Sequence, residues 1–465
     1  MKKTRLLALF LTLVLLFNCL LFTGCSVLFP DTPDEPTDEP ITDDPGTGDP
    51  TDDPTDDPTE DPGKDPEDDK EPGKDWFDGV TTGAYRISRE KLEATLALTL
   101  AKVDFCIENY DGGFPGAYSS NDVYSISKKN QSGWVQGFWP GVLWHAYELS
   151  GDVKYLDAAS GYVDSFYTRI DEKLGVDNHD MGFLFVPSCV SAYELTGDER
   201  AKEAAIMAAD QLLTRYHEDA GFIQAWGTFG DEAEYRLIID CLVNLSLLYW
   251  ASEVTGDAKY ANVATTHFES TLKTCYRENG STFHTYFFDP ETKEPSHGAT
   301  KQGASDDSSW ARGQSWAMYG PVFAYAYTGS EVALEYFKKA TNYFISKLPA
   351  DMVPYWDLIY GASSGEPRDS SAGAIAVCAI LEGCKYLEDS DPDKAKFLNF
   401  AHRMMNSLID NYATTSVSPD ANGLLTGATQ NRKTEKGVEE MTPFSDYFYI
   451  EALHRMLDPE WEMYW

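Results

Sequence analysis

The sequence lacks the residue spacings that commonly bind structural or catalytic metal ions. Its eight cysteines include no Cys-x-x-Cys pair, and its eight histidines include neither His-x-x-x-His nor His-Glu-x-x-His. Both absences argue against a zinc site. The six cysteines beyond residue 25 lie in apolar, helix-like runs, which favours buried free thiols and leaves a single disulfide as the alternative.

Basic residues are also scarce, with 37 Lys and Arg against 76 Asp and Glu and a formal net charge of −39. Residues 31–75 carry 20 acidic and 3 basic side chains, residues 1–25 carry a charge of +3, and residues 76–465 keep −25. An acidic chain of this kind argues against nucleic acid and anionic membrane surfaces as partners. It does not exclude an anionic substrate, which needs only a local cationic pocket.

The first 75 residues are interpreted as an export signal followed by a stalk. Three basic residues precede an apolar run from Leu6 to Phe22, and small residues lead to Cys25, so residues 1–25 are predicted to be a lipoprotein-type signal peptide with Cys25 lipidated. An uncleaved N-terminal anchor is the alternative. Residues 26–75, rich in Asp, Pro and Thr, are predicted to be disordered. We expect an extracytoplasmic, cell-membrane lipoprotein that contacts the membrane through its lipid anchor only.

A recurring turn organises residues 76–465. An apolar helical run ends in Gly-Asp and an amphipathic run follows, at Gly151-Asp152, Gly197-Asp198 and Gly256-Asp257, and more weakly at Gly329-Ser330. Glycine suits the left-handed end of one helix, and Asp or Ser caps the next. A helix that is apolar on every side is buried, whereas an amphipathic helix lies outside. Repeated pairs of an inner and an outer helix predict an all-α toroid.

Long segments separate these helical pairs and are predicted to be loops. Residues 111–133, 218–235, 277–308 and 350–369 hold much of the Trp, His, Asp and Gly of the chain. Long loops gathered at one end of a ring are a natural rim for an active site.

Asp240 is the most conspicuous single residue, because it is predicted to lie inside an apolar helix from Leu237 to Trp250. A buried carboxylate is costly without a partner. Arg236, Asp240 and Asn244 recur at every fourth residue and would form one polar stripe, so a structural Arg236–Asp240 ion pair is one interpretation. The other is a carboxyl whose pKa is raised by burial and which acts as a general acid.

A second carboxylate, Asp180, precedes an inner helix that is predicted to begin near Pro187. By itself Asp180 is better explained as a helix cap or turn residue. Its place one hairpin before Asp240 would let two carboxylates face each other across a pocket, as glycosidic chemistry commonly requires. A polar and aromatic cluster follows at residues 306–316, in which Arg312 offers a bidentate fork for a carboxylate.

These motifs resemble glycoside hydrolase family 88, the unsaturated glucuronyl hydrolases, over most of residues 85–465. The similarity rests on Trp134 with Gly137–Trp144, His179–Phe183, Ile238–Cys241, Ser308–Trp316, Pro367–Ser371 and Asp446–Tyr449. The resemblance implies an (α/α)6 barrel as the catalytic domain of residues 76–465. It also implies hydration of the C4=C5 vinyl ether of a Δ4,5-unsaturated uronic acid, at the non-reducing end of oligosaccharides that polysaccharide lyases produce.

By this resemblance, Asp240 would be the general acid/base that protonates C4 and activates water towards C5, and Asp180 would assist it. Substrate-binding residues would be Trp134, Trp226, His284, Gln302, Arg312 and Trp316. The expected partners are unsaturated uronide oligosaccharides of glycosaminoglycan type, and no metal or organic cofactor is implied. Three alternatives stay open: an unsaturated rhamnogalacturonyl hydrolase of family 105, an inverting (α/α)6 glycosidase acting on saturated chains, and a non-catalytic carbohydrate-binding surface lipoprotein.

Overall fold

The structure is a computed structural model, and it describes residues 84–414 and 416–465. The predicted signal peptide with Cys25 and the predicted stalk of residues 26–75 lie outside the described residues and stay predictions. Within the described ranges, no helix combines the length and the apolar character needed to cross a membrane.

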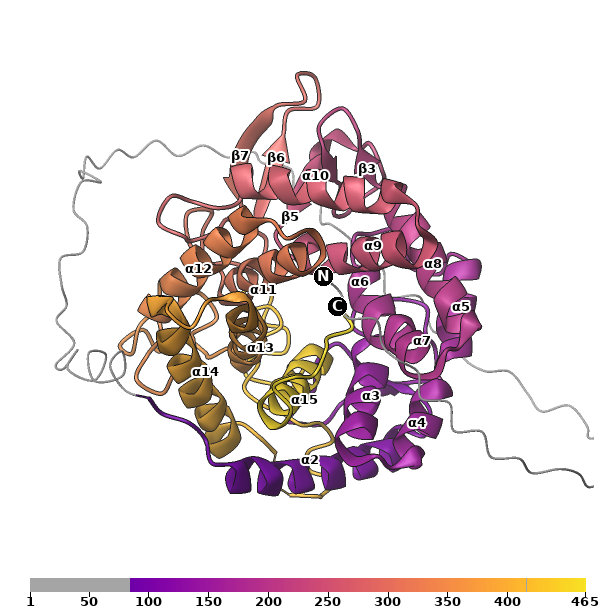
Figure 1. The fold of residues 1–465 in the computed structure, drawn as a ribbon, viewed down its shortest axis with the longest axis vertical. Helices are drawn as coiled ribbons and strands as arrows, with labels where there is room; N and C mark the ends of the chain where they lie inside the picture. The colour runs from indigo at the N-terminus through magenta and orange to yellow at the C-terminus, as the bar shows by residue number, and fades with distance from the viewer. Residues whose placement is uncertain (1–83, 415) are drawn as a thin grey trace, which may run out of the picture. The chain divides into compact units, whose positions relative to one another are not determined.

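Two concentric rings of helices build the described part of the chain (Figure 1). The inner ring consists of α3 (Phe138–Ser150), α6 (Met181–Phe185) continued by α7 (Ser191–Thr196), α9 (Cys241–Thr255), α11 (Ala311–Thr328), α13 (Ser370–Tyr386) and α15 (Pro443–Leu457). The outer ring consists of α2 (Arg89–Tyr110), α4 (Val153–Ser160) with α5 (Val163–Asp171), α8 (Glu199–Leu213), α10 (Ala258–Thr274), α12 (Glu331–Ser346) and α14 (Pro392–Asn411). The predicted (α/α)6 barrel is confirmed.

The predicted glycine turns connect four of the inner helices, α3, α7, α9 and α11, to the outer helices that follow them. Gly151, Gly197, Gly256 and Gly329 have φ angles of 69°, 72°, 74° and 68°, the left-handed conformation in which a side chain would be strained. The aspartates after the first three glycines accept hydrogen bonds from backbone N–H groups of the next helix. Each turn therefore ends one helix and starts the next.

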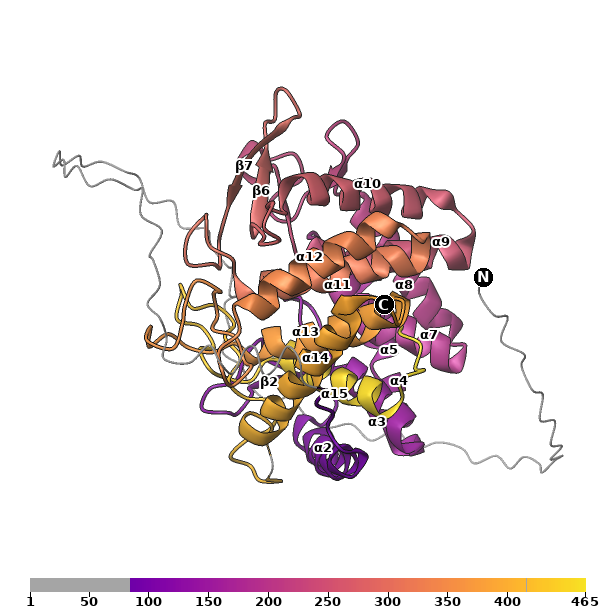
Figure 2. The same ribbon diagram turned by 60° about the vertical axis from the view of Figure 1, so that its left-hand side comes forward.

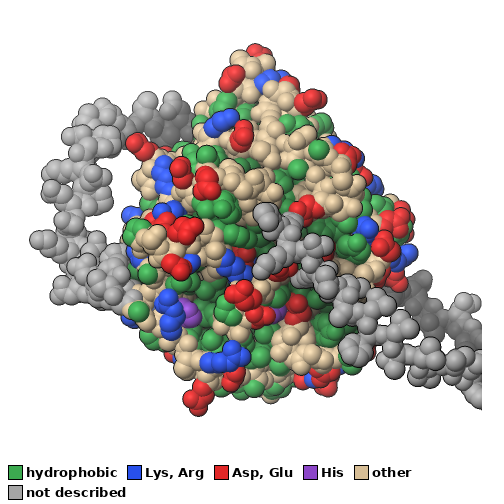
Figure 3. Space-filling model, viewed as in Figure 1, with side chains coloured by type: hydrophobic (Ala, Val, Ile, Leu, Met, Phe, Trp, Pro, Cys, Tyr) green, Lys and Arg blue, Asp and Glu red, His purple; other side chains and the backbone are tan. Residues whose placement is uncertain are grey.

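The inner helices form the core. Every residue of α9 from Cys241 to Ala251 is buried, whereas the amphipathic α10 buries one side only. The six described cysteines are free and buried, as predicted. Figure 3 views the barrel as in Figure 1, and on this face acidic and basic side chains alternate in small groups. Such a mixture of signs does not favour binding of a polyanion there.

The loops that lead from outer to inner helices lie at the end of the barrel where the inner helices begin (Figure 2). They contain short strands: β1 (Phe114–Pro115), β2 (Ile126–Ser127), β3 (Tyr216–His217), β4 (Phe222–Ile223), β5 (Arg236–Ile238), β6 (Thr285–Phe288) and β7 (Pro295–Ala299). Strands β5, β6 and β7 form one antiparallel sheet, and the hairpin of β6 and β7 projects from the barrel (Figure 2).

Candidate active site

Asp180 and Asp240 each directly precede an inner helix, α6 and α9 respectively. Their backbones occupy the capping position, but neither side chain caps its helix. Asp180 is only 8% exposed. Asp240 is partly exposed, and its Oδ1 atom is buried without a hydrogen-bond partner among the described residues. Both carboxyls thus lie at the end of the barrel where the loops gather.

The predicted local structure around both aspartates was wrong in part. The apolar residues before Asp240 belong to strand β5, which pairs with β6, and α9 begins only at Cys241. A short apolar run suits a buried strand and a buried helix equally well, so periodicity cannot separate them. Arg236 therefore forms its ion pair with Glu234 and shares no helical stripe with Asp240. The helix after Asp180 begins at Met181, before the predicted start near Pro187.

Burial raises the pKa of both carboxyls. The pKa of Asp180 rises from 3.8 to about 8, first through burial and then through the charge of Asp240, while Arg169 and Arg215 act in the opposite direction. Burial raises the pKa of Asp240 from 3.8 to about 7, against the effect of Arg312. A carboxyl with a pKa near neutrality can donate a proton and take one back. The two aspartates are best described as an interacting pair.

His284 presents an N–H donor beside this pair. Its Nδ1 accepts hydrogen bonds from the backbone N–H groups of Lys301 and Gln302, at 3.0 and 3.3 Å. Burial, aided by nearby cations, lowers the pKa of His284 to about 3, so the ring is neutral and its proton resides on Nε2. This Nε2 atom is buried and has no partner among the described residues. The backbone carbonyl of His284 accepts from Ile239 N–H at 3.0 Å, which holds the backbone of His284 against the residue before Asp240.

Aromatic rings enclose the same end of the barrel. Trp226 lies 6.3 Å from both His179 and His284, measured between ring centroids. The contacts continue through Trp310, Arg312, Phe444, Trp134 and Phe183, with successive separations of 4.4 to 5.3 Å. His179 and Phe183 flank Asp180, so this chain of ring contacts returns to its starting point. Aromatic faces of this kind, with a few polar groups among them, suit a sugar-binding site.

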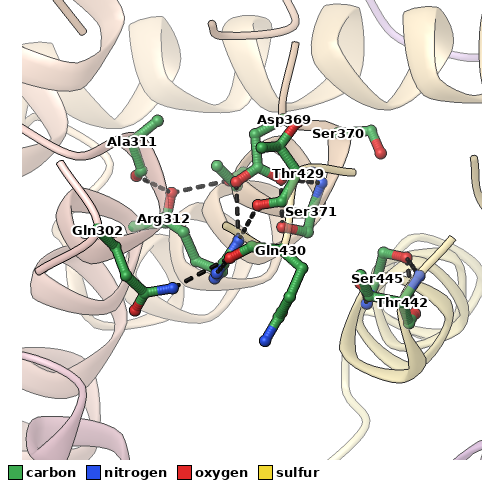
Figure 4. A network of polar contacts seen from close by, with 12 residues as sticks. Gln302, Ala311, Arg312, Asp369, Ser370, Ser371, Thr429, Gln430, Thr442 and Ser445 are labelled. Atoms are coloured by element: carbon green, nitrogen blue, oxygen red, sulfur yellow. Dashed lines mark hydrogen bonds and ion pairs between the residues drawn. The ribbon is translucent and has the colours of Figure 1, made fainter. Parts of the chain in front are cut away.

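The guanidinium of Arg312 is already bound within the protein (Figure 4). Nη1 donates to Asp369 at 3.0 Å and to the Thr429 carbonyl at 2.8 Å, and Nη2 donates to the Gln430 carbonyl at 2.8 Å. The two terminal nitrogens of the guanidinium, which were predicted to bind a substrate carboxylate, therefore donate to a protein carboxylate and two backbone carbonyls. Gln302 donates to the same Gln430 carbonyl at 3.0 Å. Both side chains hold the loop of residues 428–440 over the inner helices.

Trp316 does not reach this surface. It is 1% exposed and packs against Phe183 and Phe448, at 5.1 and 5.4 Å between centroids. Its position in α11 places it in the core, beneath the aromatic wall, which consists of the rings of Trp226, Trp310, Phe444, Trp134 and Phe183. Trp134 and Trp226 remain partly exposed, and each presents a ring at the loop end. The structure thus brings the predicted residues together except for Trp316, which lies deeper.

Unpaired polar atoms concentrate at this site. Twelve buried side-chain nitrogen and oxygen atoms have no hydrogen-bond partner among the described residues. Six of them belong to this region: His179 Nδ1, Arg236 Nε, Asp240 Oδ1, His284 Nε2, Arg312 Nε and Gln430 Oε1. Buried polar groups are rarely left unpaired in native proteins, so this concentration favours a site where a ligand supplies the missing partners.

A different group of side chains has the types that bind metal ions. Among the described residues, His145, Glu148 and His454 bring potential ligand atoms within 4.8 Å of one another, in the C-terminal halves of α3 and α15. The two Nδ1 atoms lie 3.0 Å apart, a hydrogen-bond distance, and Glu148 accepts from the indole N–H of Trp461 at 2.8 Å. These contacts give each side chain a partner within the protein.

Comparison with known proteins agrees with the fold. The family model of Glycosyl Hydrolase Family 88 matches residues 106–458. The chain belongs to glycosyl hydrolase family 88. This family 88 chain is therefore a glycoside hydrolase, as the sequence predicted.

Several relatives match over most of this chain. The chain is 45% identical over 376 residues to an unsaturated chondroitin disaccharide hydrolase of Streptococcus agalactiae, covering 81% of this chain and 92% of that protein. It is 37% identical over 351 residues to an unsaturated glucuronyl hydrolase of Bacillus sp. GL1, covering 75% and 92%. A crystal structure of the unsaturated glucuronyl hydrolase from S. agalactiae matches with a TM-score of 0.80 and 43% identity, over 83% of this chain and 96% of that one.

Sequence reasoning missed several residues of this family 88 site. Phe444 completes the aromatic wall, and Arg169 and Arg215 act on the pKa of Asp180. Phe444 lies two residues before the motif at residues 446–449, a signal that was available. The two arginines end outer helices, where a basic residue is usually only solvated, so nothing in the sequence distinguished them.

Proposed function

We propose that the chain is an unsaturated glucuronyl hydrolase. It would release a Δ4,5-unsaturated uronic acid from the non-reducing end of lyase-generated oligosaccharides. The observation that carries this proposal is the pair of carboxyls, Asp180 and Asp240, with pKa values of about 8 and 7, at the starts of neighbouring inner helices. The names of the curated relatives support it.

In the proposed reaction, Asp240 acts as both acid and base. Its protonated carboxyl donates a proton to C4, and the positive charge that develops at C5 is stabilised by the ring oxygen. Asp240, now ionised, takes a proton from the water whose oxygen bonds to C5. The resulting hemiketal opens and expels the partner sugar. Asp180 holds a hydroxyl of the reacting ring, and the interaction of the two carboxyls keeps a proton on the pair near neutral pH.

Charge around the site suits an anionic sugar. The described inner helices begin here, and their N-termini carry partial positive charge. Arg236, Arg312, Lys433 and Lys301 all act on the pKa of His284, so four cations lie near its unpaired N–H group. We infer that these groups attract the uronate and any further acidic groups of the substrate. An S. agalactiae mutant enzyme has been crystallised with dGlcA-GalNAc6S, which supports a glycosaminoglycan-type substrate here.

The deciding experiment is an activity panel of unsaturated disaccharides from chondroitin, hyaluronan, heparin, gellan and rhamnogalacturonan. We expect loss of the ultraviolet absorbance of the unsaturated ring with glycosaminoglycan disaccharides. Turnover of the rhamnogalacturonan product alone would favour the family 105 activity. Cleavage of a saturated chain would favour an ordinary inverting glycosidase, and calorimetric binding without product would favour a carbohydrate-binding lipoprotein.

We further propose that the enzyme acts outside the cytoplasm, anchored through lipidated Cys25 at the end of an extended stalk. The support is the basic start, the apolar run and the small residues before Cys25, followed by the acidic stalk. Metabolic labelling with a radioactive fatty acid tests this directly. Label should appear in the wild-type membrane fraction and disappear in Cys25→Ser; equal labelling of both would refute the anchor.

A further inference from the structure

Aspartates at helix starts behave in two ways in this protein. Asp152, Asp198 and Asp257 precede outer helices, and each accepts a hydrogen bond from a backbone N–H group of its helix. This is the usual role of an aspartate at that position. Asp180 and Asp240 hold the same position in inner helices, yet neither accepts such a bond. Some other group must therefore satisfy the first N–H groups of these helices.

Asn244 is that group for α6. Its Oδ1 accepts the N–H of Phe183 at 2.8 Å, which is the third residue of α6 and the usual partner of a capping side chain. Its Nδ2 donates to the backbone carbonyl of Asp240 at 3.2 Å. Asn244 is fully buried, so neither bond competes with solvent. One amide thus connects the start of α6 to the residue that begins α9.

The packing around Asn244 leaves little freedom. A Cβ atom on Gly182 would lie 2.4 Å from the Cα atom of Asn244 and 2.9 Å from its Oδ1. The start of α6 therefore approaches α9 as closely as a glycine allows, and the amide is held at the N–H of Phe183. This close approach explains why the chain has glycine at position 182, two residues after Asp180.

We propose that Asn244 is a positioning residue that caps α6 in place of Asp180 and thereby keeps the Asp180 carboxylate available for substrate. The proposal rests on the proposed function and deepens it, because it explains how a residue at a capping position escapes the capping role. Without the amide, the N–H of Phe183 is left unpaired, and the nearest remedy is for Asp180 to turn and accept it.

Such a turn changes the titration of the pair. A backbone N–H that donates to Asp180 stabilises its ionised form and lowers its pKa. The other charged groups that act on this carboxyl are Asp240, directly before α9, Arg169 from α5 and Arg215, which follows α8. His179 contacts it at 3.4 Å. Replacing residue 244 removes none of these charges, and among these groups Asn244 bonds only to Asp240, through its backbone carbonyl. The alkaline limb of the kcat/KM profile should therefore move to lower pH.

The test compares Asn244→Leu, which keeps the size but removes the acceptor, with Asn244→Asp, which keeps the acceptor and adds a carboxyl. We expect Asn244→Leu to lower kcat about 10- to 100-fold with KM within about threefold, because the carboxyl is misplaced, and to move the alkaline limb to lower pH. In Asn244→Asp, the alkaline fall of kcat/KM should occur at the same pH as in the wild type or at a higher pH, because an added negative charge raises neighbouring carboxyl pKa values. Ser246→Ala, a buried change in the same helix, is the matched control and should leave the limb in place.

Direct titration separates this proposal from the proposed function. The pKa of Asp180, followed by NMR of carboxyl-labelled aspartate without substrate, should fall in Asn244→Leu even if the wild type turned over no unsaturated sugar. A lower melting temperature with an unchanged limb and an unchanged Asp180 pKa would show that Asn244 is only structural, and would overturn the proposal. Should Asn244→Leu fail to fold, Asn244→Ala takes its place with the same two outcomes.

Discussion

Replacing Asp240 by asparagine should abolish turnover and at the same time stabilise the protein above neutral pH. The change is nearly isosteric, and Asp240 makes no side-chain capping bond that could be lost. A general acid commonly contributes about 10²- to 10⁴-fold to a rate, so kcat should fall by at least that much. Substrate binding should change little, because the amide can still contact a sugar hydroxyl.

The stability effect follows from the raised pKa of Asp240, 3.8 in the unfolded chain and about 7 in the folded one. The folded state holds this proton more tightly than the unfolded state does. The free energy of unfolding therefore falls as pH rises from about 4 to about 7, and the loss stays constant above pH ~7. At ~1.4 kcal/mol per pKa unit, the opposition reaches about 4 kcal/mol. Asparagine does not titrate, so the stability difference between variant and wild type should grow by about 3 to 4 kcal/mol from pH 4 to pH 8.

Urea unfolding at pH 4, 6 and 8 and initial rates on the preferred disaccharide check both halves of this prediction. Asp198→Asn is the matched control, since asparagine caps a helix as well as aspartate does and Asp198 lies in the turn between α7 and α8, at the opposite end of the inner helix from Asp180. Turnover within tenfold of the wild type would show that Asp240 is not the acid. A stability difference that stays flat with pH would show that its pKa is not raised.

Three further outcomes follow from the same structure. Arg312→Ala should destabilise the protein by about 3 to 5 kcal/mol in urea unfolding, because it leaves Asp369 buried without its partner; a loss under 1 kcal/mol would contradict this. Wild-type kcat/KM should fall as pH rises through about 7 to 8, where Asp240 and Asp180 lose their protons; a rate that rises across that range would refute the acid role. Trp316→Ala should cost about 3 to 5 kcal/mol of stability with KM little changed, because the ring is in the core; a large rise in KM at unchanged stability would instead make Trp316 a substrate contact.

The ring of helices could be predicted from sequence because its signal is local. Gly151, Gly197 and Gly256 each need a left-handed conformation, and the aspartate after each glycine starts the next helix. The start of α9 could not be predicted, because Leu237 and Ile238 are buried on a strand that pairs with residues almost fifty positions away. That pairing is a tertiary contact, and no local pattern reports it.

Arg312 shows why residue type and proximity to a site do not assign a role. The paired N–H donors of its guanidinium suit a carboxylate, and the sequence predicted that this carboxylate belongs to the sugar. The structure gives it Asp369 instead, an aspartate that also caps α13. Because the same guanidinium holds the carbonyls of Thr429 and Gln430, the loop of residues 428–440 depends on this buried pair for its position. We therefore expect replacement of Arg312 to affect stability at least as strongly as substrate affinity, because the side chain holds this loop.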